Sequence, residues 1–568
     1  MPNKTIANPI PILQRLAQQR GWSNIDWQRF LDPTPPITNT LRALPGTDLA
    51  LARIAKAVKN NERILVYGDY DVDGITSVSL LIKTIRATQC RWLHWQIPDR
   101  NAADYGLDHA AVDRLLATAP RPNLVITLDC GSGATTEIQR LADQGIDTIV
   151  IDHHQTVPNA PHPSIAHLNP KAHLLPEPLA TDLGRLCTAG LAFLFTELLQ
   201  THLELPDTNR QAHLIIAGLG TIADAVELQG TNRNIVKLAL RAINDKQTLQ
   251  QLPGLACQME TNESIKAQQL AFGIVPKLNA TGRIARADIA VDLLLTNNAD
   301  QAKQLAQRCT ELNDQRKEIQ QHIMEEAEQL ALASLARDPN QGVLLLYREN
   351  WHPSIVGIVA GRLKDNLQRS IILLGRHNDG YWRGSGRNFG NGDLGQIAVA
   401  LVNRKLAHRG GGHRQAIGLK ATTEQLDQAA AWLQANYRHD PAQATQTEYI
   451  GDWDELPPEE WCQLFNRLEP FGQGNPKPSL RAQHMQAAHA SAPLITKLNH
   501  VWAMKNSFTN AAGKTIEVIT KNLAVGICEW TTGSQHQLDL AVGAKEYHGR
   551  RYFNWVALQS RKTPVFTN

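Results

Sequence analysis

A short acidic motif near residue 70 is the part of the sequence with the clearest potential for chemistry. The segment GDYDVDG, residues 68–74, places Asp69, Asp71 and Asp73 within five residues. Three carboxylates this close together repel each other, so the motif is costly unless a cation neutralises it. A solvated acidic turn remains an alternative. A calcium loop of the EF-hand type is disfavoured, because the twelfth position counted from Asp69 is Leu80 and not a bidentate Glu.

Two later strand-like segments end in residues of the same kind. The segment LDCG contains Asp129, and IDHH ends in Asp152, His153 and His154. The carboxyl ends of parallel strands meet at one edge of a sheet, so we expect these side chains to converge with the acidic motif. Asp224, in the segment IAD, is a further candidate. A lone Asp at the end of a helix is more often a cap or a surface residue.

This mixture of carboxylates and imidazoles favours Mn²⁺ or Mg²⁺ over zinc, because oxygen ligands dominate and no thiolate is placed to join them. Six or seven ligands are too many for one ion that must keep a water molecule. Two neighbouring ions that share a carboxylate would use them all, and such pairs activate water and stabilise phosphoryl transition states. The sequence therefore predicts metal-assisted hydrolysis of a phosphoester or a phosphoanhydride.

The elements that must position these residues read as an open α/β domain. Residues 63–69, 123–131 and 147–154 are contiguous apolar runs of the kind found in buried parallel strands, and WLHWQIP, residues 92–98, is a possible further strand. Residues 75–87 and 134–145 have helical spacing and suit crossover connections.

The rest of the chain predicts three further regions. After Leu174 the pattern is mainly helical, and residues 299–337 contain no Gly or Pro, which indicates one long helix. A second α/β pattern begins at residue 342, and the last 120 or so residues alternate in short strand-like pieces that suggest a small β-barrel. We therefore expect domains at 1–235, 236–337, 338–440 and 441–568.

Composition narrows the protein class. Apolar residues make up 42% and charged residues 20% of the 568 residues, which is typical of ordered globular domains. Seven scattered cysteines without a C-x-x-C spacing argue against a disulfide framework and against a zinc-thiolate site. No apolar run approaches the length of a membrane span and the N-terminal residues lack a secretory pattern, so we expect a soluble cytoplasmic protein without membrane contact.

The second α/β region has a basic character. Between Arg348 and Arg414 the sequence has eleven Lys or Arg against four acidic residues, although such an excess is often only a solvated face. It coincides with two glycine-dense loops, residues 384–393 and 409–418, where backbone N–H groups can approach phosphate oxygens. Neither these loops nor Gly131-x-Gly133 completes a dinucleotide fingerprint. The region therefore predicts a surface that binds a phosphate backbone.

Taken together, these segments resemble the motifs of a known family. The segments GDYDVDG, LDCG, DHH and IAD look like the four motifs of the DHH phosphoesterases, and their order and spacing resemble those of the RecJ single-strand exonucleases. The resemblance extends over nearly the whole chain, through residues 279–296, 351–363, 384–388, 410–418 and 468–478.

The resemblance implies a role for each motif residue. It implies that two metal ions, Mn²⁺ or Mg²⁺, are held with Asp129 as the bridging ligand. His154 would lie beside the phosphate as a hydrogen-bond donor or general acid, and Asp152 would orient the histidines, so that His154, Asp129 and Asp152 form the catalytic set. The implied metal ligands are Asp69, Asp71, Asp73, Asp129, His153 and Asp224.

The resemblance also implies a DHH-associated domain that holds the DNA end over the metals, and a C-terminal barrel of the oligonucleotide-binding (OB) type. Taken alone, His413 could equally be structural and Arg283 could cap a helix. The implied nucleic-acid-binding residues are Arg283, Ser385, Arg387, Gly411, Gly412 and His413.

For the function, the resemblance implies a 5′ to 3′ exonuclease specific for single-stranded DNA, which releases 5′-mononucleotides in repair and recombination. A single-strand-binding protein and a helicase would be partners, and the protein would act as a monomer. Two alternatives stay open. One is a DHH phosphoesterase that acts on short oligonucleotides, and the other is a catalytically inactive single-strand-binding replication factor, which the complete Asp and His set disfavours.

Overall fold

The computed structural model describes residues 10–32, 38–100, 106–206, 209–259, 264–439, 448–487, 492–495, 501–521, 535–547 and 550–562. By their contacts the residues divide into two compact units. The larger unit comprises residues 33–442 and 472–475, and the smaller unit comprises residues 1–32, 443–471 and 476–568. Within the described ranges, no helix is both long enough and apolar enough to span a membrane.

The larger unit begins with a five-stranded parallel sheet of order β2-β1-β3-β4-β5. Its strands form because runs of buried aliphatic residues can pack on both faces of a parallel sheet. The strands are β1 (Ile64–Gly68), β2 (Leu93–Gln96), β3 (Leu124–Leu128), β4 (Asp147–Ile151) and β5 (Ala166–Leu168). The predicted strands, including the possible one at residues 92–98, are thereby confirmed.

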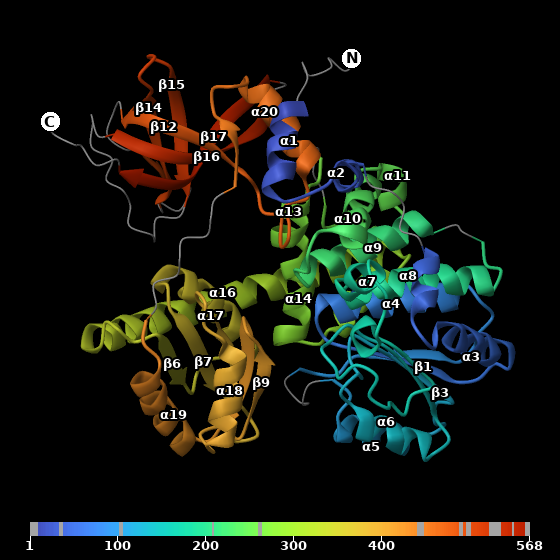
Figure 1. The fold of residues 1–568 in the computed structure, drawn as a ribbon. Coiled ribbons are helices and arrows are strands. Elements are labelled where there is room, and N and C mark those ends of the chain that lie inside the picture. The colour runs from blue at the N-terminus through green and yellow to red at the C-terminus, as the bar shows by residue number, and fades with distance from the viewer. Residues whose placement is uncertain are drawn as a thin grey trace. The chain divides into compact units, whose positions relative to one another are not determined.

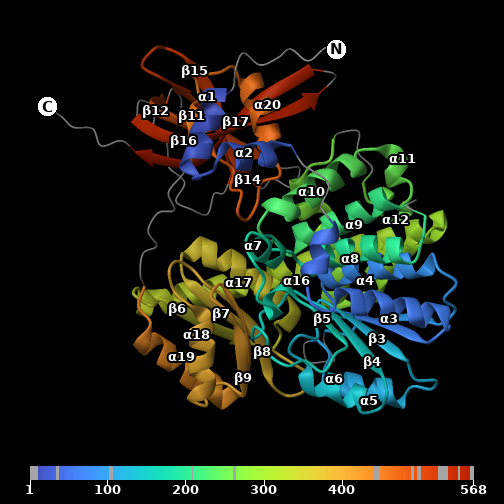
Figure 2. The ribbon, with the colours of Figure 1, turned by 45° about the vertical axis from the view of Figure 1, so that its right-hand side comes forward.

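Helices cover both faces of this sheet (Figure 1, Figure 2). On one face lie α3 (Thr47–Lys59), preceded by a 3₁₀ helix (Thr38–Ala43), α4 (Val72–Arg86), α8 (Thr188–His202) and α9 (Arg210–Ala223), packed in one large apolar core. On the other face α5 (His109–Ala117) and α6 (Thr135–Ala142) form a smaller core with Leu65, Tyr67 and Val125.

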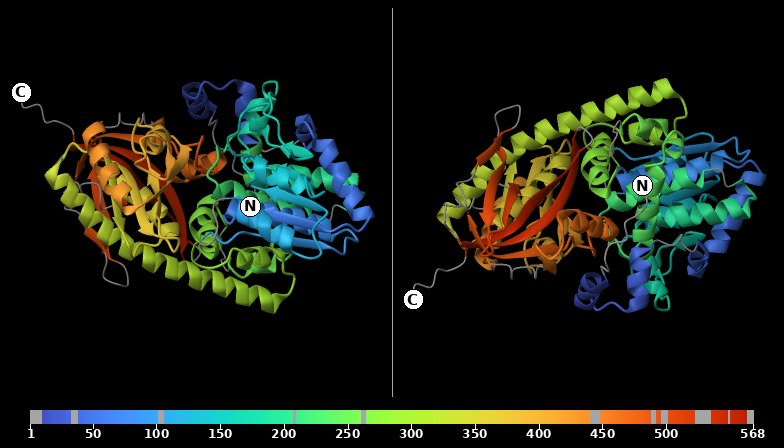
Figure 3. Two further views of the ribbon diagram at one scale, coloured as in Figure 1. Left: turned by 90° about the horizontal axis from the view of Figure 1, so that it is seen from below. Right: turned by 90° about the horizontal axis from the view of Figure 1, so that it is seen from above.

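A helical region then leads to a second domain. It comprises α7 (Leu179–Gly184), α10 (Gly230–Ile243), the short α11 (Lys246–Leu249), α12 (Pro253–Ala256) and α13 (Ala267–Gln269), a π-helical turn (Leu270–Ile274), α14 (Val275–Ile284) and α15 (Asp288–Leu295). The long helix α16 (Ala299–Arg337) has 39 residues, as its sequence predicts. It contacts α12, α14 and α15 and then α17 and β6, so it runs beside both α/β domains of this unit (Figure 3).

The second domain is a five-stranded mixed sheet of order β6-β7-β8-β10-β9, in which only β6 and β7 are parallel. Helices α16 and α17 cover one face and α18 and α19 the other. The elements are β6 (Val343–Arg348), α17 (Pro353–Leu367), β7 (Ser370–Arg376), β8 (Trp382–Arg387), α18 (Leu394–Asn403), β9 (Arg409–His413), β10 (Ala416–Ala421) and α19 (Thr423–Asn436).

The smaller unit contains a ring of five paired strands. β12 pairs with β16, β16 with β17, β17 with β15, β15 with β14, and β14 with β12, and only the β15–β17 pair is parallel. The elements are β11 (Tyr449–Asp452), α20 (Pro458–Leu468), β12 (Ser479–Ala487), β13 (Ala492–Ile495), β14 (Val501–Thr509), β15 (Thr515–Lys521), β16 (Gln535–Tyr547) and β17 (Arg550–Lys562).

The two N-terminal helices, α1 (Ile10–Gln19) and α2 (Asn24–Leu31), belong to this smaller unit. Leu13, Leu16 and Phe30 are buried in the same core as Trp461. The sequence pattern predicts that residues 1–32 belong with the first α/β domain, but their contacts place them in the smaller unit. The packing partners of α1 lie more than 400 residues away, and no local pattern reports such a distance.

Candidate active site

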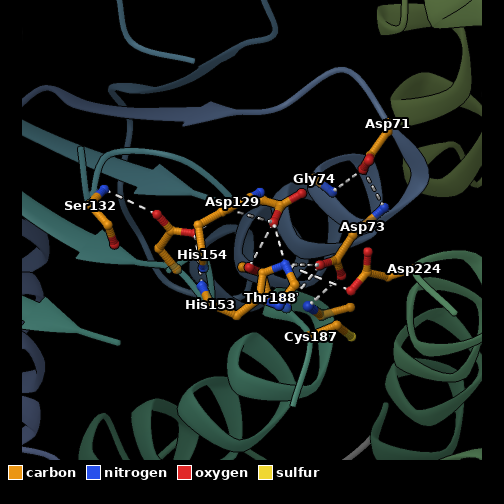
Figure 4. A network of polar contacts seen from close by, with 12 residues as sticks. Asp71, Asp73, Gly74, Asp129, Ser132, His153, His154, Cys187, Thr188 and Asp224 are labelled. Carbon is orange, nitrogen blue, oxygen red and sulfur yellow. Dashed lines mark hydrogen bonds and ion pairs between the residues drawn. The ribbon is translucent and has the colours of Figure 1, made fainter. Parts of the chain in front are cut away.

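Three aspartates lie together because the parallel strands end in register. Gly68 of β1 pairs with Leu128 of β3, and Leu128 pairs with Ile151 of β4, so the next residues, Asp69, Asp129 and Asp152, leave the sheet at one edge. Their backbone N–H groups continue the ladder, with Asp129 N donating to the Ile151 carbonyl at 3.0 Å. Figure 4 shows Asp129 with Asp73, His153 and Asp224 nearby.

Asp71 and Asp73 are placed by the start of α4. Asp71 caps the helix and accepts from the Asp73 and Gly74 N–H groups at 2.9 and 3.3 Å. Asp73 in turn accepts from two N–H groups at the start of α8, Thr188 at 2.8 Å and Ala189 at 2.7 Å. The turn is tight, because a Cβ on Gly74 would lie 2.4 Å from the Asp69 carbonyl oxygen. A helix N-terminus carries partial positive charge, so this contact stabilises the carboxylate of Asp73.

Asp129 is held in an unusual conformation. Its φ of 63° lies in the left-handed region, which a non-glycine residue adopts at a cost of about 1–3 kcal/mol. Its side chain is buried, and its Oδ1 accepts a hydrogen bond of 2.9 Å from the Thr188 hydroxyl. The conformation directs the carboxylate toward the other candidate ligands (Figure 4).

Asp152 holds the two histidines and does not face the other carboxylates. Its Oδ1 accepts from the N–H groups of His153 (2.7 Å) and His154 (3.1 Å) and lies 2.7 Å from His154 Nδ1. Its Oδ2 accepts from the Ser132 N–H at 3.0 Å. Asp152 therefore holds the backbone of both histidines and the ring of His154.

His153 points into the carboxylate cluster. Its Nε2 lies 3.5 Å from Asp129, 3.7 Å from Asp224 and 3.8 Å from Asp73. Asp224 follows the last residue of α9, so the helix end carries it into the site and not onto the surface. Through these contacts the structure brings together all six predicted metal ligands.

The donor atoms fall into groups that suit a divalent cation. Within the described residues, three sets have ligand atoms less than 4.8 Å apart, and Asp129 and His153 each belong to two sets. Asp69 Oδ1 is buried and has no hydrogen-bond partner among the residues that the structure describes. A buried carboxylate oxygen is costly without a partner, so the residues fit a bound metal ion. The sets are Asp69, Asp71 and Asp129; Asp73, His153 and Asp224; and Asp129, His153 and His154.

The electrostatics of the cluster favour a bound cation. Burial, together with neighbouring carboxylates, raises the pKa of Asp69 and of Asp129 well above the usual range. The same causes raise the pKa of Asp73 to about 6 and that of Asp224 to about 8. So many carboxylates cannot all be charged at neutral pH unless positive charge compensates them.

The two histidines have opposite protonation preferences. Burial, together with the charge of His154, lowers the pKa of His153 to about 3, so His153 is neutral and can act as a ligand. Burial also acts to lower the pKa of His154, but the hydrogen bond to Asp152 and its charge raise that pKa to about 9. A protonated His154 whose Nδ1–H points to Asp152 offers Nε2–H as a donor.

Three guanidinium groups, those of Arg100, Arg283 and Arg387, lie beside the acidic cluster. Arg283 on α14 donates to the Ser354 carbonyl of α17 at 2.6 Å, and the Arg387 guanidinium on β8 donates to Ser385 Oγ at 2.5 Å. Burial, followed by the charge of Arg100, lowers the pKa of both arginines, to about 9 for Arg283. None of the three arginines has an ion pair among the described residues, so they are poised to bind an anion.

The glycine-rich strand β9 lies at the edge of the second sheet. Arg387 pairs with Ala416 and Ala416 with His413, which puts Arg387 and His413 in one row across three strands. Gly412 has a φ of 141°, and a Cβ there would lie 2.3 Å from the Ala416 carbonyl oxygen. Gly412 and His413 also line a cavity of about 500 Å³ beside α18. His413 is thus exposed at a sheet edge and not buried as a structural histidine.

Sequence reasoning missed two residues of this site. Thr188 binds Asp129 across 59 positions of sequence, and nothing near it signals a ligand. Arg100 follows a strand as a single basic residue, and its guanidinium lies over the Tyr70 ring at 4.6 Å. The one feature of the sequence that could have identified Arg100 is its position after the end of a strand, which is also the feature that identified the aspartates.

Comparisons with known proteins agree with this geometry. The model of the DHH family, N-terminal domain, matches residues 63–219, and the DHHA1 domain matches residues 340–438. The single-stranded-DNA-specific exonuclease RecJ of Salmonella typhimurium is 30% identical over 500 residues, which is 82% of each chain. RecJ of Thermus thermophilus is 30% identical over 458 residues, covering 80% of this chain and 63% of that protein.

Solved structures give the same result. The crystal structure of Thermus thermophilus RecJ with Mn²⁺ has a TM-score of 0.78 at 26% identity and covers 98% of this chain and 76% of that chain. A manganese-bound exonuclease RecJ has a TM-score of 0.58 at 30% identity, covering 69% of this chain and 94% of that chain. With a DHH domain, a DHHA1 domain and relatives of this similarity along most of its length, this chain belongs to the RecJ family.

Proposed function

We propose that this chain is a metal-dependent exonuclease that hydrolyses single-stranded DNA from the 5′ end and releases 5′-mononucleotides. The observation that carries the proposal is the cluster of six carboxylate and imidazole ligands at the carboxyl edge of the first sheet, with its unpartnered Asp69 oxygen. The RecJ relatives are by name single-stranded-DNA-specific exonucleases, which supports the choice of substrate.

The residues that would hold the metals are the six predicted ones. Asp129 and His153 each belong to two donor sets, but only the carboxylate of Asp129 has two oxygens to offer, so Asp129 would be the shared ligand. Mn²⁺ or Mg²⁺ bound there would supply an activated water and neutralise charge on the phosphate. Asp73 and Asp129 are oriented for this by the start of α8, and His153 by its neighbour Asp152. These hydrogen bonds support the ligand side chains from outside the metal sites.

His154 is the proposed proton donor. Asp152 accepts from its Nδ1 and keeps the ring charged, so the proton on Nε2 is available to the phosphate or to the leaving oxygen. Asp152 itself is buried and held by Ser132, which prevents it from turning toward the metals.

The arginine cluster is the proposed anchor for a phosphate of the strand. Arg100, Arg283 and Arg387 lie beside the carboxylate cluster, with Ser385 bound to Arg387. Gly411, Gly412 and His413 offer an exposed edge in the same sheet, where backbone N–H groups can approach further phosphates. Contacts of this kind position the strand without reading its bases.

We also propose that the smaller unit is an OB-type module that binds single strands. Five strands paired in a ring, with one parallel pair, are the arrangement expected of such a barrel, and Lys514 lies over the Trp453 ring at 4.6 Å. The domains proposed are the DHH domain to residue 235, the helical connector to 337, the DHHA1 domain to 440 and the barrel with α1 and α2.

A role in DNA repair and recombination follows from this activity. A monomer in the cytoplasm, working with a single-strand-binding protein and a helicase, is the arrangement we propose. Hydrolysis of short oligonucleotides is the second candidate, favoured by the compact pairing of the metal ligands with three arginines, which a short substrate would also satisfy.

The test is digestion of 5′-labelled single-stranded and blunt duplex DNA of one sequence, with Mn²⁺, with Mg²⁺ or with a chelator. We expect labelled mononucleotides from the single strand only, and none with the chelator. Products confined to oligonucleotides of a few residues would favour the second candidate. Equal digestion of the blunt duplex, or no products with either metal, would contradict the proposal.

A further inference from the structure

A buried turn beside the two histidines has no role in the site described so far. It consists of Asn169, Pro170 and Lys171, which follow β5 and open a short 3₁₀ helix (Pro170–Ala172). β5 is the edge strand next to β4, and its Leu168 carbonyl accepts from the Asp152 N–H at 3.2 Å. The turn is therefore attached directly to the strand that carries the histidines.

The turn holds the backbone carbonyls of both histidines. Asn169 Nδ2 donates to the His154 carbonyl at 2.9 Å, and Lys171 Nζ donates to the His153 carbonyl at 2.5 Å. Asn169 Oδ1 accepts from the Lys171 N–H at 2.9 Å, which links the two donors. Two successive carbonyls are thus fixed by two side chains of one turn.

Asn169 also reaches the residue that supports Asp152. Its Nδ2 donates to Ser132 Oγ at 2.8 Å, while the Ser132 N–H donates to Asp152 Oδ2 at 3.0 Å. Ser132 Oγ also lies 2.8 Å from His167 Nε2. Asn169 is fully buried, and both protons of its amide and its oxygen are used.

We propose that Asn169 and Lys171 are positioning residues that set the direction of the two histidine rings. Asp152 holds the N–H groups of His153 and His154, and the turn holds their C=O groups, so the peptide planes between them cannot rotate. His153 then points at the carboxylates while His154 stays bound to Asp152. The inference rests on the proposed function, because the two rings matter only if the site hydrolyses phosphodiesters.

The alternative is that the turn merely stabilises the fold. Side-chain amides that bridge backbone carbonyls occur elsewhere in this unit. Asn244, an exposed residue, donates to the Leu240 and Ile265 carbonyls at 2.7 and 2.9 Å and accepts from the Ile265 N–H at 2.7 Å. It repeats the bonding pattern of Asn169 and contacts none of the proposed ligands, so it serves as a control for this bonding pattern away from the site.

The experiment compares Asn169→Asp, Lys171→Met, Lys171→Arg and Asn244→Asp with the wild-type enzyme. Asn169→Asp keeps the shape but turns both donors into acceptors, and Lys171→Met keeps the length of a half-buried side chain without its donor. The measurements are kcat and KM on a single-stranded oligonucleotide, Mn²⁺ affinity by calorimetry, and the urea midpoint in chelator.

We expect kcat and Mn²⁺ affinity to fall roughly 10- to 100-fold in Asn169→Asp and Lys171→Met, the usual range when a partner that orients a ligand is lost. KM for the strand should stay near the wild-type value, and Lys171→Arg should recover most of the activity. Asn244→Asp should lower the urea midpoint alone.

Two results would overturn the inference. One is wild-type kcat and Mn²⁺ affinity in Lys171→Met, a change that the fold tolerates because Lys171 is half-exposed. The other is an equal loss of kcat in Asn244→Asp, which would show that lowered stability explains the effect. An inactive wild-type enzyme would instead count against the proposed function, so the two failures are distinguishable.

Discussion

Asp129 has a left-handed backbone and a buried carboxylate, and it belongs to two of the groups of side chains that could hold a metal ion. The left-handed backbone and the buried carboxylate both lower the stability of the fold. A protein keeps such features where the surrounding structure holds the residue firmly in place. Here Thr188 and the end of β4 supply that support. At the scale of a single residue, the site is therefore organised around Asp129.

Asp129→Asn is predicted to abolish hydrolysis while strand binding persists. The substitution keeps the shape and removes the charge that two cations would share, so the rate should fall by more than roughly 100-fold, beyond the usual effect of residues that only orient ligands. In chelator the variant should melt no lower than the wild type, because mutual repulsion among the carboxylates is relieved. Product formation and thermal melting check both statements.

The matched control is Asp143→Asn, which changes an exposed aspartate that follows α6. It should leave the rate unchanged. A near-wild-type rate in Asp129→Asn would eliminate a shared carboxylate between two ions.

At the scale of elements, helix α9 carries a buried histidine, His213, that lowers the stability of the fold at acidic pH. His213 is buried, and within the described part of the chain neither ring nitrogen has a hydrogen-bond partner. Burial, with a contribution from the charge of Lys83, lowers its pKa to about 4. The unfolded chain, with a pKa near 6.5, binds the proton more readily, so folding loses stability as the pH falls from about 6.5 to 4.

His213→Leu is predicted to remove this part of the acid sensitivity, which amounts to about 3 kcal/mol at the low end of the range. The measurement is the urea midpoint at pH 7 and pH 4.5, in chelator, for variant and wild type. Because the carboxylate cluster titrates in both proteins, the difference between them isolates His213. Parallel pH dependences would mean that His213 is accessible to protons in the folded state.

The second prediction at the scale of elements concerns Arg387 on strand β8. Arg387 should bind a phosphate, so Arg387→Gln should lower kcat/KM by a similar factor on every sequence and reduce the salt slope of binding by about one. His413→Ala, in the same row, should act on all sequences alike. Arg383→Gln is the control, because Arg383 lies four residues earlier on β8 and is paired with Asp379 at 2.6 Å. A defect confined to particular bases would contradict backbone reading.

The sequence predicts some of these elements well and others not at all. The strands before Asp69, Asp129 and Asp152 are visible because a buried parallel strand needs a continuous apolar run. Helix α16 is visible because 39 residues of strong helix formers contain no Gly or Pro. Thr188 and Asn169 are not, because each acts through one contact to a residue distant in the chain, which leaves no periodic signal.

At the scale of the whole molecule, the division into units changes how the barrel should be tested. Removing everything after residue 445 would also remove Gly472–Asn475, whose Gln473 carbonyl accepts from the Leu228 N–H at 2.8 Å in the larger unit. It would further leave α1 and α2 without their core. A cleaner variant lacks residues 1–32, 443–471 and 476–568, with a short Gly/Ser linker that joins residue 442 to residue 472 and so keeps the turn.

That variant is predicted to bind long strands more weakly and to keep its chemistry on short ones. If the barrel tracks the backbone, KM on long strands should rise and the salt dependence of binding should decrease, because fewer phosphates are neutralised. Steady-state kinetics on strands of two lengths and at several salt concentrations would measure this. An unchanged KM and salt slope would show that the barrel binds another partner.

The core of the smaller unit joins the two ends of the chain, and this has a consequence for synthesis. Arg15 of α1 pairs with Glu455 across 440 residues. At the usual rate of translation, α1 leaves the ribosome roughly 20 to 90 s before its packing partners exist. For that time Leu13 and Leu16, which are buried in the finished protein, have α2 but none of the C-terminal residues of their core to pack against. The larger unit can fold meanwhile, so the first helices made are among the last to reach their native place.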